Sequence, residues 1–568
     1  MLVSMKFLFI FISFVFLLTL LFGNPFFNFS QLKNEPELHG NFLHITDFHP
    51  DPHYINNVTA KSRCHKHLRP TSDKPEHMLR GISGPWGAPA TICDSPLGLI
   101  DATFEWLDKN WKNKLDFIIW TGDNSRHDND ENIPRTPTEI FQLNKLIADK
   151  FLKTFLNKKE YAPHFIPIVP SIGNNDIYPN RIMGAGPNEV LTVLHDIWSP
   201  FIPKGQHKTF INGGYYYREV IPGKLIVVSL NTLYFYKSNA AVNGCMVKGQ
   251  PGTIEMEWLN DVLVNARKNG MKVYLTGHIA PRAKQYTVSC YKKYGRLSLK
   301  YQDIILGHFY GHSNMDHFFF ISANGIKKDN PNPKEDDEVL LMDDEDLYEE
   351  DDDNGDDDNG DDDNETVEHQ GGQINKQANE KVETNVKDIK EYMKKLLNHY
   401  LTLPPLTDDI VKEYAVVHIN PSIIPTFFPA LRIFNYNTTE IKVNTNEISE
   451  LDAPSRKNTF LTPLGYTQYF MNLTHANLYP NVTPEFTVEY TTRDDYDMRD
   501  LTIPSWIQLA RRIAYDGLNS ALWDKIRDHL LVGTRKLISQ KRKSFQRCIY
   551  SDCPAKGPED YIASELSF

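Results

Sequence analysis

The chain has 568 residues and a mass of 65.5 kDa, enough for one large catalytic domain with additions or for two to four ordinary domains. Hydrophobic residues make up 40% of it, which excludes wholesale disorder. The net charge of −12 comes from one segment: residues 335–365 hold 20 acidic residues and no Lys or Arg, and outside them 61 Lys and Arg face 53 Asp and Glu. This mild basic surplus is smaller than a constitutive nucleic-acid binder usually carries.

The first predicted element is a transmembrane signal anchor at residues 7–29, after a short cytosolic tail at residues 1–6. No charge occurs between Lys6 and Lys33, and the apolar run with its flanks reaches the roughly 20 residues that cross a bilayer. A cleaved signal peptide is the alternative, but small residues suited to cleavage are hard to find near Gly23. The single Lys on the short N-terminal side favours a cytosolic N-terminus. We therefore expect a single-pass type II membrane protein with a lumenal body.

Two counts support a lumenal body. Six glycosylation sequons, which predict a glycoprotein, occur at Asn28, Asn57, Asn364, Asn437, Asn472 and Asn481. The six cysteines form no Cys-x-x-Cys zinc pair, and an even number in an oxidising lumen predicts up to three disulfides. Sequence neighbours suggest the pairs Cys64–Cys93, Cys245–Cys290 and Cys548–Cys553. Fifteen connectivities are possible, and free buried thiols are the alternative.

Between residues 41 and 325, short apolar runs of strand length end repeatedly in polar clusters. The runs cover residues 42–46, 115–121, 165–172, 225–230, 272–276, 303–306 and 318–321. Helical patterns lie between some of them, at residues 98–111, 138–156 and 252–269. The alternation predicts an α/β fold with helices on the faces of a sheet, in which the loops that leave the strand ends carry the chemistry.

Residues 330–383 break this pattern. Their Asp-Asp-Asp-Asn-Gly repeats cannot bury apolar surface, so we expect a disordered acidic insert. A calcium loop is the alternative, but the terminal bidentate Glu and the flanking helices are missing. We expect helices at residues 386–400 and 505–539, in a C-terminal region of residues 386–568 that completes or flanks the catalytic domain. Because the anchor and the insert are both exposed to cleavage, maturation by lumenal proteases is a further expectation.

Five predicted strands lead into clusters of metal-binding side chains. In chain order the clusters are Asp47-Phe48-His49, Gly122-Asp123, Gly173-Asn174, Gly277-His278 and Gly311-His312. Imidazole together with carboxylate or amide oxygen suits Zn, Mn, Fe, Co or Mg. Two cations about 3.5–4 Å apart can clamp the attacking and departing oxygens of a phosphoryl displacement, and a carboxylate such as Asp123 suits the bridge between them. The pattern predicts metal-assisted hydrolysis of a phosphate ester or anhydride.

In this order the clusters resemble the five blocks of the calcineurin-like metallophosphoesterase superfamily. The longer strings are similar to those of fungal vacuolar endopolyphosphatases, relatives of the acid sphingomyelinase-like phosphodiesterases: Asp47-Phe48-His49-x-Asp51, Gly122-Asp123-Asn124-x-Arg126-His127-Asp128, Gly173-Asn174-Asn175-Asp176 and Gly311-His312-x-Asn314-x-Asp316-His317-Phe318. The resemblance implies a metallophosphoesterase-type β-sandwich flanked by helices over residues 41–325. It also implies cleavage of inorganic polyphosphate on the lumenal side of the vacuole membrane.

The resemblance implies a ligand set for two divalent metal ions, whose identity (Mn, Zn, Co, Fe or Mg) stays open. In the order first metal, bridge, second metal, the implied ligands are Asp47 and His49, then Asp123, then Asn174, His278 and His312. Relatives usually read Gly-His-x-His in the last block, with the second His on the first metal. Asn314 stands there in this chain, so we expect its amide oxygen to replace an imidazole.

Three further residues are the catalytic candidates. Relatives place a His near the leaving group where this chain has Asn175, and an amide cannot transfer a proton at pH 5–8. His127 matches another His that relatives keep close to the phosphate, so we expect a proton donor or phosphate ligand, with a supporting structural role as the alternative. Arg126 is the candidate for a guanidinium fork on a phosphate oxygen, with a salt bridge to Asp128 or a neighbour as the alternative. His308 could be a ligand, but we favour a structural role.

The leading hypothesis is therefore a membrane-anchored lumenal enzyme that hydrolyses internal phosphoanhydride bonds of polyphosphate, with no nucleic-acid partner. The alternative enzyme is a sphingomyelinase-like phosphodiesterase or a nucleotide phosphohydrolase on the same scaffold. A third hypothesis is a polyphosphate-binding protein in which Asn175 and Asn314 mark a decayed site. The presence of the other six expected ligands argues against decay.

Overall fold

The computed structural model describes residues 38–66, 82–157, 164–327, 381–440, 457–517 and 520–538. The chain divides into an N-terminal unit of residues 1–39 and a large unit of residues 40–568, and every element below belongs to the large unit. Within the described ranges, no helix has both the length and the apolar character needed to cross a membrane. The predicted anchor, the acidic insert up to residue 380 and the pair Cys548–Cys553 lie outside these ranges.

A first six-stranded sheet has the order β16-β15-β14-β1-β4-β7. β1, β4 and β7 run parallel, and β14, β15 and β16 continue the sheet in antiparallel pairs. The bounds are β1 Asn41–Ile45, β4 Phe117–Trp120, β7 Ile168–Pro170, β14 Ala430–Tyr436, β15 Pro463–Phe470 and β16 Thr487–Thr491. β1 and β4 are buried almost throughout, as expected of parallel strands that are covered on both faces.

A second six-stranded sheet has the order β12-β13-β11-β10-β9-β8. Its four central strands are parallel, and β8 and β12 are antiparallel to their neighbours. The bounds are β8 Tyr216–Ile221, β9 Leu225–Ser229, β10 Lys272–Thr276, β11 Ile305–Tyr310, β12 His317–Ser322 and β13 Tyr414–Ile419. Two short pairs complete the strands of the described residues: β2 Pro50–Asp51 with β3 Ser95–Pro96, and β5 Leu156–Asn157 with β6 His164–Phe165.

The two sheets pack face to face through aromatic rings. Phe42 of β1 stacks between Phe117 and Phe434 of its own sheet, with ring centroids 4.8 Å away on each side. The same ring lies 5.4 Å from Tyr274 and from Phe309 of the second sheet. All five side chains are buried. This aromatic layer fixes the distance between the sheets, and with it the separation of the loops that leave their strands.

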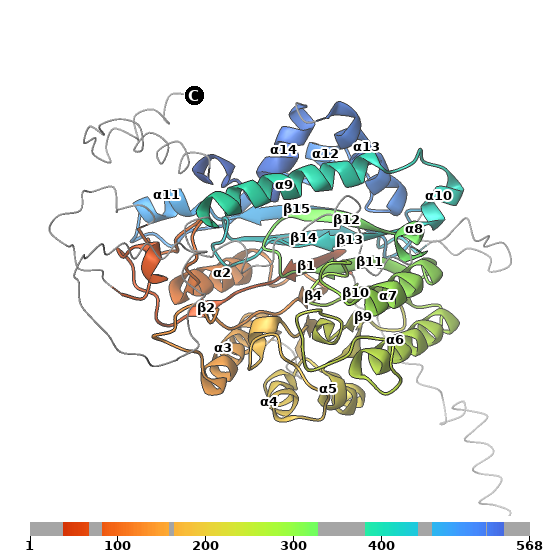
Figure 1. The fold of residues 1–568 in the computed structure, drawn as a ribbon, viewed down its shortest axis with the longest axis horizontal. Coiled ribbons are helices and arrows are strands. Elements are labelled where there is room, and N and C mark those ends of the chain that lie inside the picture. The colour runs from red at the N-terminus through yellow and green to blue at the C-terminus, as the bar shows by residue number, and fades with distance from the viewer. Residues whose placement is uncertain are drawn as a thin grey trace, which may run out of the picture. The chain divides into compact units, whose positions relative to one another are not determined.

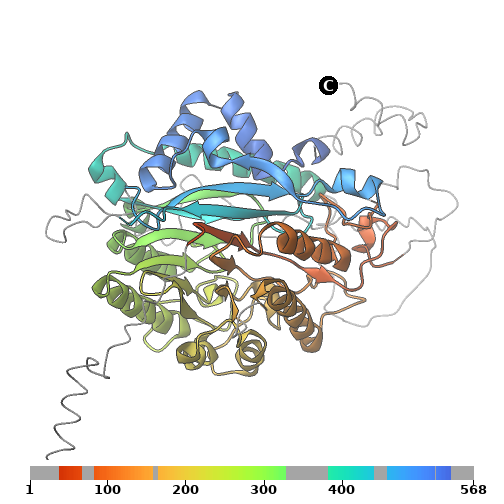
Figure 2. The ribbon, with the colours of Figure 1, turned by 180° about the vertical axis from the view of Figure 1, so that it is seen from behind.

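Helices cover the sheets on both sides. Their bounds are α2 Leu97–Asn110, α3 Pro137–Phe155, α4 Glu189–Trp198, α5 His207–Gly213, α6 Pro251–Lys268, α7 Val288–Lys300, α8 Ala323–Lys327, α9 Lys381–Leu401, α10 Asp408–Lys412, α11 Leu473–Leu478, α12 Thr492–Tyr496, α13 Ile503–Asp516 and α14 Ala521–Leu530. α9, α13 and α14 lie on one side of the strands, and α4 and α5 on the opposite side (Figures 1 and 2). Tyr400 and Trp506 join α9 and α13 to β12 by packing on Phe318.

Most predicted elements are confirmed, with corrections in three places. β11 continues to Tyr310, so His308 lies inside the strand and not in the loop after it. The helix expected at residues 505–539 is two helices, because Gly517 adopts a φ of 72° and ends α13. The C-terminal region supplies the unpredicted strands β13 to β16, and β13 lies between β11 and β12.

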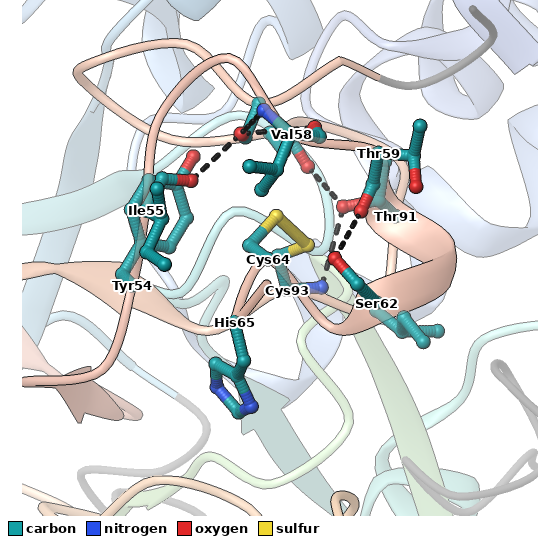
Figure 3. The surroundings of a disulfide bond; sticks show 12 residues. Tyr54, Ile55, Val58, Thr59, Ser62, Cys64, His65, Thr91 and Cys93 are labelled. Carbon is teal, nitrogen blue, oxygen red and sulfur yellow. Dashed lines mark hydrogen bonds between the residues drawn. A yellow bond between two sulfur atoms is a disulfide. The ribbon is translucent and has the colours of Figure 1, made fainter. Parts of the chain in front are cut away.

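Two of the expected disulfides are confirmed: Cys64–Cys93 and Cys245–Cys290. The first lies in a small apolar cluster with Val58, Ala60 and Ala88, against which Tyr54 and Ile55 pack (Figure 3). The second joins the segment before α6 to α7. The Cys64–Cys93 bond therefore has a hydrophobic core of its own beside the main one.

Candidate metal centre

The candidate ligands lie in the loops that follow five parallel strands. Asp47 and His49 follow β1, Asp123 follows β4, and Asn174 follows β7, all in the first sheet. His278 follows β10 and His312 follows β11, in the second sheet. All six side chains are buried, with at most 4% exposed. The carboxyl ends of the parallel strands of both sheets therefore meet in one buried centre.

The donor atoms form two overlapping groups. Asp47, His49 and Asp123 make one group, and Asp123, His278 and His312 make the other; within each group one donor atom per residue lies within 4.8 Å of the others. Asp123 is common to both groups, which is the position that a bridging carboxylate needs. His278 Nε2 is also 3.0 Å from Asn174 Oδ1, so this amide joins the second group.

Backbone carbonyls orient two of the imidazoles. His49 Nδ1 lies 2.9 Å from Ser125 O, and His278 Nδ1 lies 2.7 Å from Thr121 O. Because a carbonyl can only accept, each Nδ1 carries the proton and donates it. Each Nε2 then faces the carboxylates, at 3.5 Å (His49) and 3.2 Å (His278) from Asp123 Oδ2. A neutral imidazole with a free Nε2 is the form that binds a metal.

The donors fit a cation. Asp47 Oδ1 and His49 Nε2 are buried and have no hydrogen-bond partner among the described residues, a costly state for polar atoms. Burial alone would lower the pKa of His278, but the charge and hydrogen bond of Asp123, together with Asp47, raise it to about 10. The buried carboxylates thus attract positive charge strongly. Buried carboxylates, amides and imidazoles around such a field suit divalent metal binding.

The backbone at the centre is held in unusual conformations. Asp47, His49, Asp123, His312 and Asn314 all have positive φ, between 39° and 72°, although none is a glycine. Such conformations cost energy and persist where the surrounding structure imposes them, typically at functional sites.

Two glycines leave the space that the ligands occupy. A Cβ on Gly173 would lie 2.0 Å from Asp123 Oδ1, and a Cβ on Gly311 would lie 2.7 Å from Asp47 Oδ2. Any other residue at these positions would collide with a carboxylate of the centre. The glycines of these two clusters are therefore needed for packing against the ligands and not only for the turn.

Asn175 and Asp176 hold the loops together. The backbone N–H of Asn175 donates to Asp123 Oδ1 (2.8 Å), and its Nδ2 donates to Asp123 Oδ2 (3.0 Å). Asp176 accepts from the backbone N–H groups of Asp123, Asn124 and Gly173 at 2.7–3.0 Å. No role for Asp176 was evident from the sequence. Its contacts join the loop after β4 to the loop after β7.

His127 lies at the edge of the centre with a partner that the sequence did not mark. Its ring stacks on that of His49, with centroids 4.2 Å apart and planes 11° apart. Its Nδ1 lies 2.7 Å from Asp94 Oδ1, and Asp94 is 4% exposed. Asp94, His127 and His49 form a third group of potential ligand atoms. Asp94 lies three residues before the start of α2 and follows no predicted strand, so the strand-end pattern could not find it.

Arg126 is held by a carboxylate of the chain itself, and its contact with substrate stays a prediction. Its Nε and Nη2 bind both oxygens of Glu139, at 2.7 and 3.1 Å, and its remaining contacts are carbonyls. The alternative, a salt bridge to Asp128 or a neighbour, is confirmed with Glu139 as the partner. The guanidinium fork is already occupied, because α3 brings Glu139 against it. Arg126 therefore joins α3 to the loop after β4.

Two other residues are placed as follows. Asn314 Oδ1 accepts a hydrogen bond from Ser422 Oγ, and the ligand role of Asn314 stays a prediction. His308 Nδ1 lies 2.7 Å from Tyr294 Oη, and burial lowers the pKa of His308 to about 3. The structural role favoured for His308 is confirmed.

The fold and the site together define a class, the metal-binding phosphoesterases. Residues 40–316 match the family model described as calcineurin-like phosphoesterase. Among solved structures, a dimetal phosphatase from Danio rerio matches with a TM-score of 0.28 and 11% identity, over 51% of this chain and 85% of that chain, too weak a likeness to support an argument.

Three curated relatives narrow the class. The chain is 37% identical to the endopolyphosphatase of Cryptococcus neoformans, over 73% of this chain and 61% of the relative. It is 36% identical to that of Saccharomyces cerevisiae (72% and 63%) and 32% identical to that of Schizosaccharomyces pombe (85% and 84%). The chain thus spans less than two thirds of the length of the first two. It belongs to the endopolyphosphatase family of the calcineurin-like phosphoesterases.

Proposed function

We propose that this chain hydrolyses internal phosphoanhydride bonds of inorganic polyphosphate and releases shorter chains. The observation that carries the proposal is the shared position of Asp123 in two groups of buried donor atoms at the strand ends. Two metal ions on these groups would supply a nucleophilic hydroxide and neutralise the charge that develops on the phosphoryl oxygens. The endopolyphosphatase relatives support polyphosphate as the substrate.

The residues of the chain position these groups before substrate arrives. Asn175 fixes the bridging carboxylate with two hydrogen bonds to Asp123. The carbonyls of Ser125 and Thr121 set the protonation of the two imidazoles so that each Nε2 faces the centre. His127, at the edge and 18% exposed in its side chain, is the candidate to hold or deliver a proton at the departing oxygen.

A buried guanidinium supports an anionic substrate. Arg135 is 3% exposed, and its Nη1 donates to the carbonyls of Arg126 and Asn175, both at 2.9 Å. Its Nε and Nη2 have no hydrogen-bond partner among the described residues. This pair of N–H groups is the edge that grips two oxygens of a phosphate. We therefore assign to Arg135 the phosphate contact that was expected of Arg126 from the sequence.

The proposal extends to where the chain works. The apolar run at residues 7–29 supports a single-pass anchor with the catalytic unit in the lumen, and the two disulfides support an oxidising compartment. The sequons at Asn57 and Asn481 lie on exposed residues, as glycosylation requires. The vacuole membrane, glycosylation and lumenal maturation of the chain are parts of this proposal.

The test is a gel assay of the full chain on long polyphosphate, with Mn²⁺, Zn²⁺, Co²⁺ or Mg²⁺ and with chelator. We expect metal-dependent shortening to intermediate lengths. Asp123→Asn should abolish it, while Asp303→Asn is the matched control, because Asp303 pairs with Arg267 away from the centre and is 44% exposed in its side chain. Release of monophosphate alone, or turnover of only nucleotides or phosphodiesters with every metal, would overturn the proposal.

A further inference from the structure

Asp94 controls the ring of His127. Asp94 Oδ2 accepts from the backbone N–H of His127 at 2.7 Å, and Asp94 Oδ1 lies 2.7 Å from its Nδ1. A carboxylate only accepts, so Nδ1 carries the proton and donates it. The ring is thereby fixed in orientation and tautomer, flat against His49, and Nε2 is the nitrogen left for a substrate.

Asp94 itself is held on both sides along the chain. On one side Cys93 is bonded to Cys64. On the other side Ser95 N donates to the carbonyl of His49 at 3.0 Å, and β3 pairs with β2 in parallel. The residue that carries this carboxylate therefore lies between the disulfide-bonded Cys93 and Ser95, whose N–H is bonded to the loop of the candidate ligand His49.

The other half of the disulfide makes a matching contact. His65, the neighbour of Cys64, lies beside the disulfide in Figure 3. Its Nε2 is 2.8 Å from Asp51 Oδ2, and its Nδ1 is 2.8 Å from Asp130 Oδ2. Asp51 lies in β2, two residues after His49, and Asp130 lies in the loop that carries His127. Each cysteine thus precedes a residue that holds a loop of the centre through a buried contact between an imidazole and a carboxylate.

We propose that Asp94 is the positioning residue of His127, and that the Cys64–Cys93 disulfide is the scaffold that holds Asp94 in place. The inference rests on the proposed function, because it assigns the support of one residue at the proposed site. It goes beyond that function by making activity depend on a disulfide outside the metal centre. Asp94 acts through His127, which engages both of its oxygens.

The first test is a double-mutant cycle on Asp94→Ala and His127→Ala in the full chain. Activity is measured on long polyphosphate and on a dialkyl phosphodiester, whose alkoxide leaving group needs a proton, and bound metal by mass spectrometry. We expect His127→Ala to lower kcat by about 100-fold or more, and Asp94→Ala by about 10- to 100-fold. The double variant should be no slower than His127→Ala, with KM and metal content unchanged in all three.

Asp94→Asn separates positioning from simple packing. The amide has the size of the carboxylate but only one acceptor oxygen, whereas His127 presents two donors, its N–H and its Nδ1–H. One of the two contacts must fail, or the ring must move its proton to Nε2. We expect a wild-type unfolding temperature with kcat lowered at least 10-fold. A structural role alone would leave kcat unchanged in this variant.

The disulfide is tested by comparing two pairs of substitutions. Cys64→Ser/Cys93→Ser removes the bond beside Asp94, and Cys245→Ser/Cys290→Ser removes the control bond. Both should lower the unfolding temperature. Well below that temperature, only the first pair should lower kcat, and adding His127→Ala to it should cause no further loss. Equal kcat losses in the two pairs would overturn the role of Cys64–Cys93.

The outcomes also separate this inference from the proposed function. If the wild type does not shorten polyphosphate but cleaves the phosphodiester, the proposed substrate fails, and the cycle on the phosphodiester still tests Asp94. Additive losses in the cycle, or wild-type kcat in Asp94→Asn, would overturn the positioning role. If Asp94→Ala lost a bound metal ion although His127 is still present, Asp94 would be a metal ligand and the positioning role would be wrong.

Discussion

Two buried clusters of charge in this protein differ in how they are paired. At the metal centre, Asp47 Oδ1 and His49 Nε2 have no hydrogen-bond partner among the described residues. Around Asp316, both oxygens are bound, one to Arg432 Nη2 and the other to Tyr490 Oη. Arg432 donates in turn to Gln468 Oε1 and to a backbone carbonyl, and lies over the ring of Tyr466. The metal centre thus contains acceptor atoms without a hydrogen-bond donor among the described residues, whereas both carboxylate oxygens of Asp316 are hydrogen-bonded.

Unpaired buried polar atoms, and not buried charge as such, distinguish the candidate metal site from the structural cluster. Both clusters are buried and contain carboxylates, so burial of charge alone does not distinguish them. The Asp316–Arg432 pair neutralises itself and links β14 to the loop before β12, which is a structural use. The metal centre keeps an excess of negative charge that its imidazoles cannot neutralise in their metal-binding form. Substitutions should therefore chiefly affect activity and metal binding in the metal centre, and stability alone around Asp316.

The largest effect is expected for Asp123→Asn. The change removes the charge shared by both donor groups, so activity should fall on the order of 10³-fold or more. In chelator, the variant should also unfold earlier than wild type, because Asn has one acceptor oxygen for the two donors of Asn175 and loses the charge that faces His278. Adding Mn²⁺ should raise the unfolding temperature of wild type but not that of the variant. An equal Mn²⁺-induced rise in both proteins would show that Asp123 is not a ligand.

Asp316→Asn should give the opposite result. It leaves the buried guanidinium of Arg432 without its anionic partner, which costs about 3 kcal/mol of the free energy of unfolding. Metal content and kcat should stay close to wild type. Urea denaturation in chelator measures the first quantity, and metal analysis with a kinetic assay measures the others. A large loss of bound metal with little loss of stability would remove the distinction between the clusters.

Two arginines sharpen the same contrast. Arg135→Lys cannot form a two-pronged contact with phosphate, so KM for polyphosphate should rise by about 10-fold. Arg126→Lys breaks the paired contact with Glu139, so it should lower stability by about 1–2 kcal/mol with KM unchanged. Initial rates over a range of polyphosphate concentrations, together with denaturation curves, test both. If KM rose in Arg126→Lys and not in Arg135→Lys, the assignment of the phosphate contact would be reversed.

The sequence predicted the local part of the site because each ligand follows its own apolar run within a few residues. It did not predict partners that only the tertiary structure brings together. β14 pairs with β1, with Asn435 opposite Asn41, although the two residues are 394 positions apart in the chain. Asp94 and His127 are 33 residues apart, with no spacing rule that joins them. Arg126 and Arg135 both lie in the segment between β4 and α3. Only their contacts show that Arg126 is paired with Glu139, whereas Nε and Nη2 of Arg135 have no hydrogen-bond partner among the described residues.

The smallest effect expected is a pH dependence of stability that comes from His65. Both ring nitrogens of His65 have partners, as the guanidinium of Arg432 does, but the imidazole can titrate near neutral pH. Burial alone would lower the pKa of His65, but hydrogen bonds and charges from Asp51 and Asp130 raise it above its ordinary value of 6.5. Burial would raise the pKa of Asp130, but the hydrogen bonds from His65 and Asn132 outweigh burial and lower this pKa to about 2. Asp130 therefore stays charged.

The raised pKa of His65 fixes the sign of this dependence. Above pH 6.5 the folded protein keeps a proton that the unfolded chain has lost, so the stabilisation is complete below pH 6.5 and disappears as the pH rises through the folded pKa. The gap in unfolding temperature between wild type and His65→Gln, measured in chelator, should narrow from pH 5.5 to pH 8.5. A gap that widened over this range would mean that His65 is neutral in the fold, and that its bridge between Asp51 and Asp130 depends on hydrogen bonds without charge.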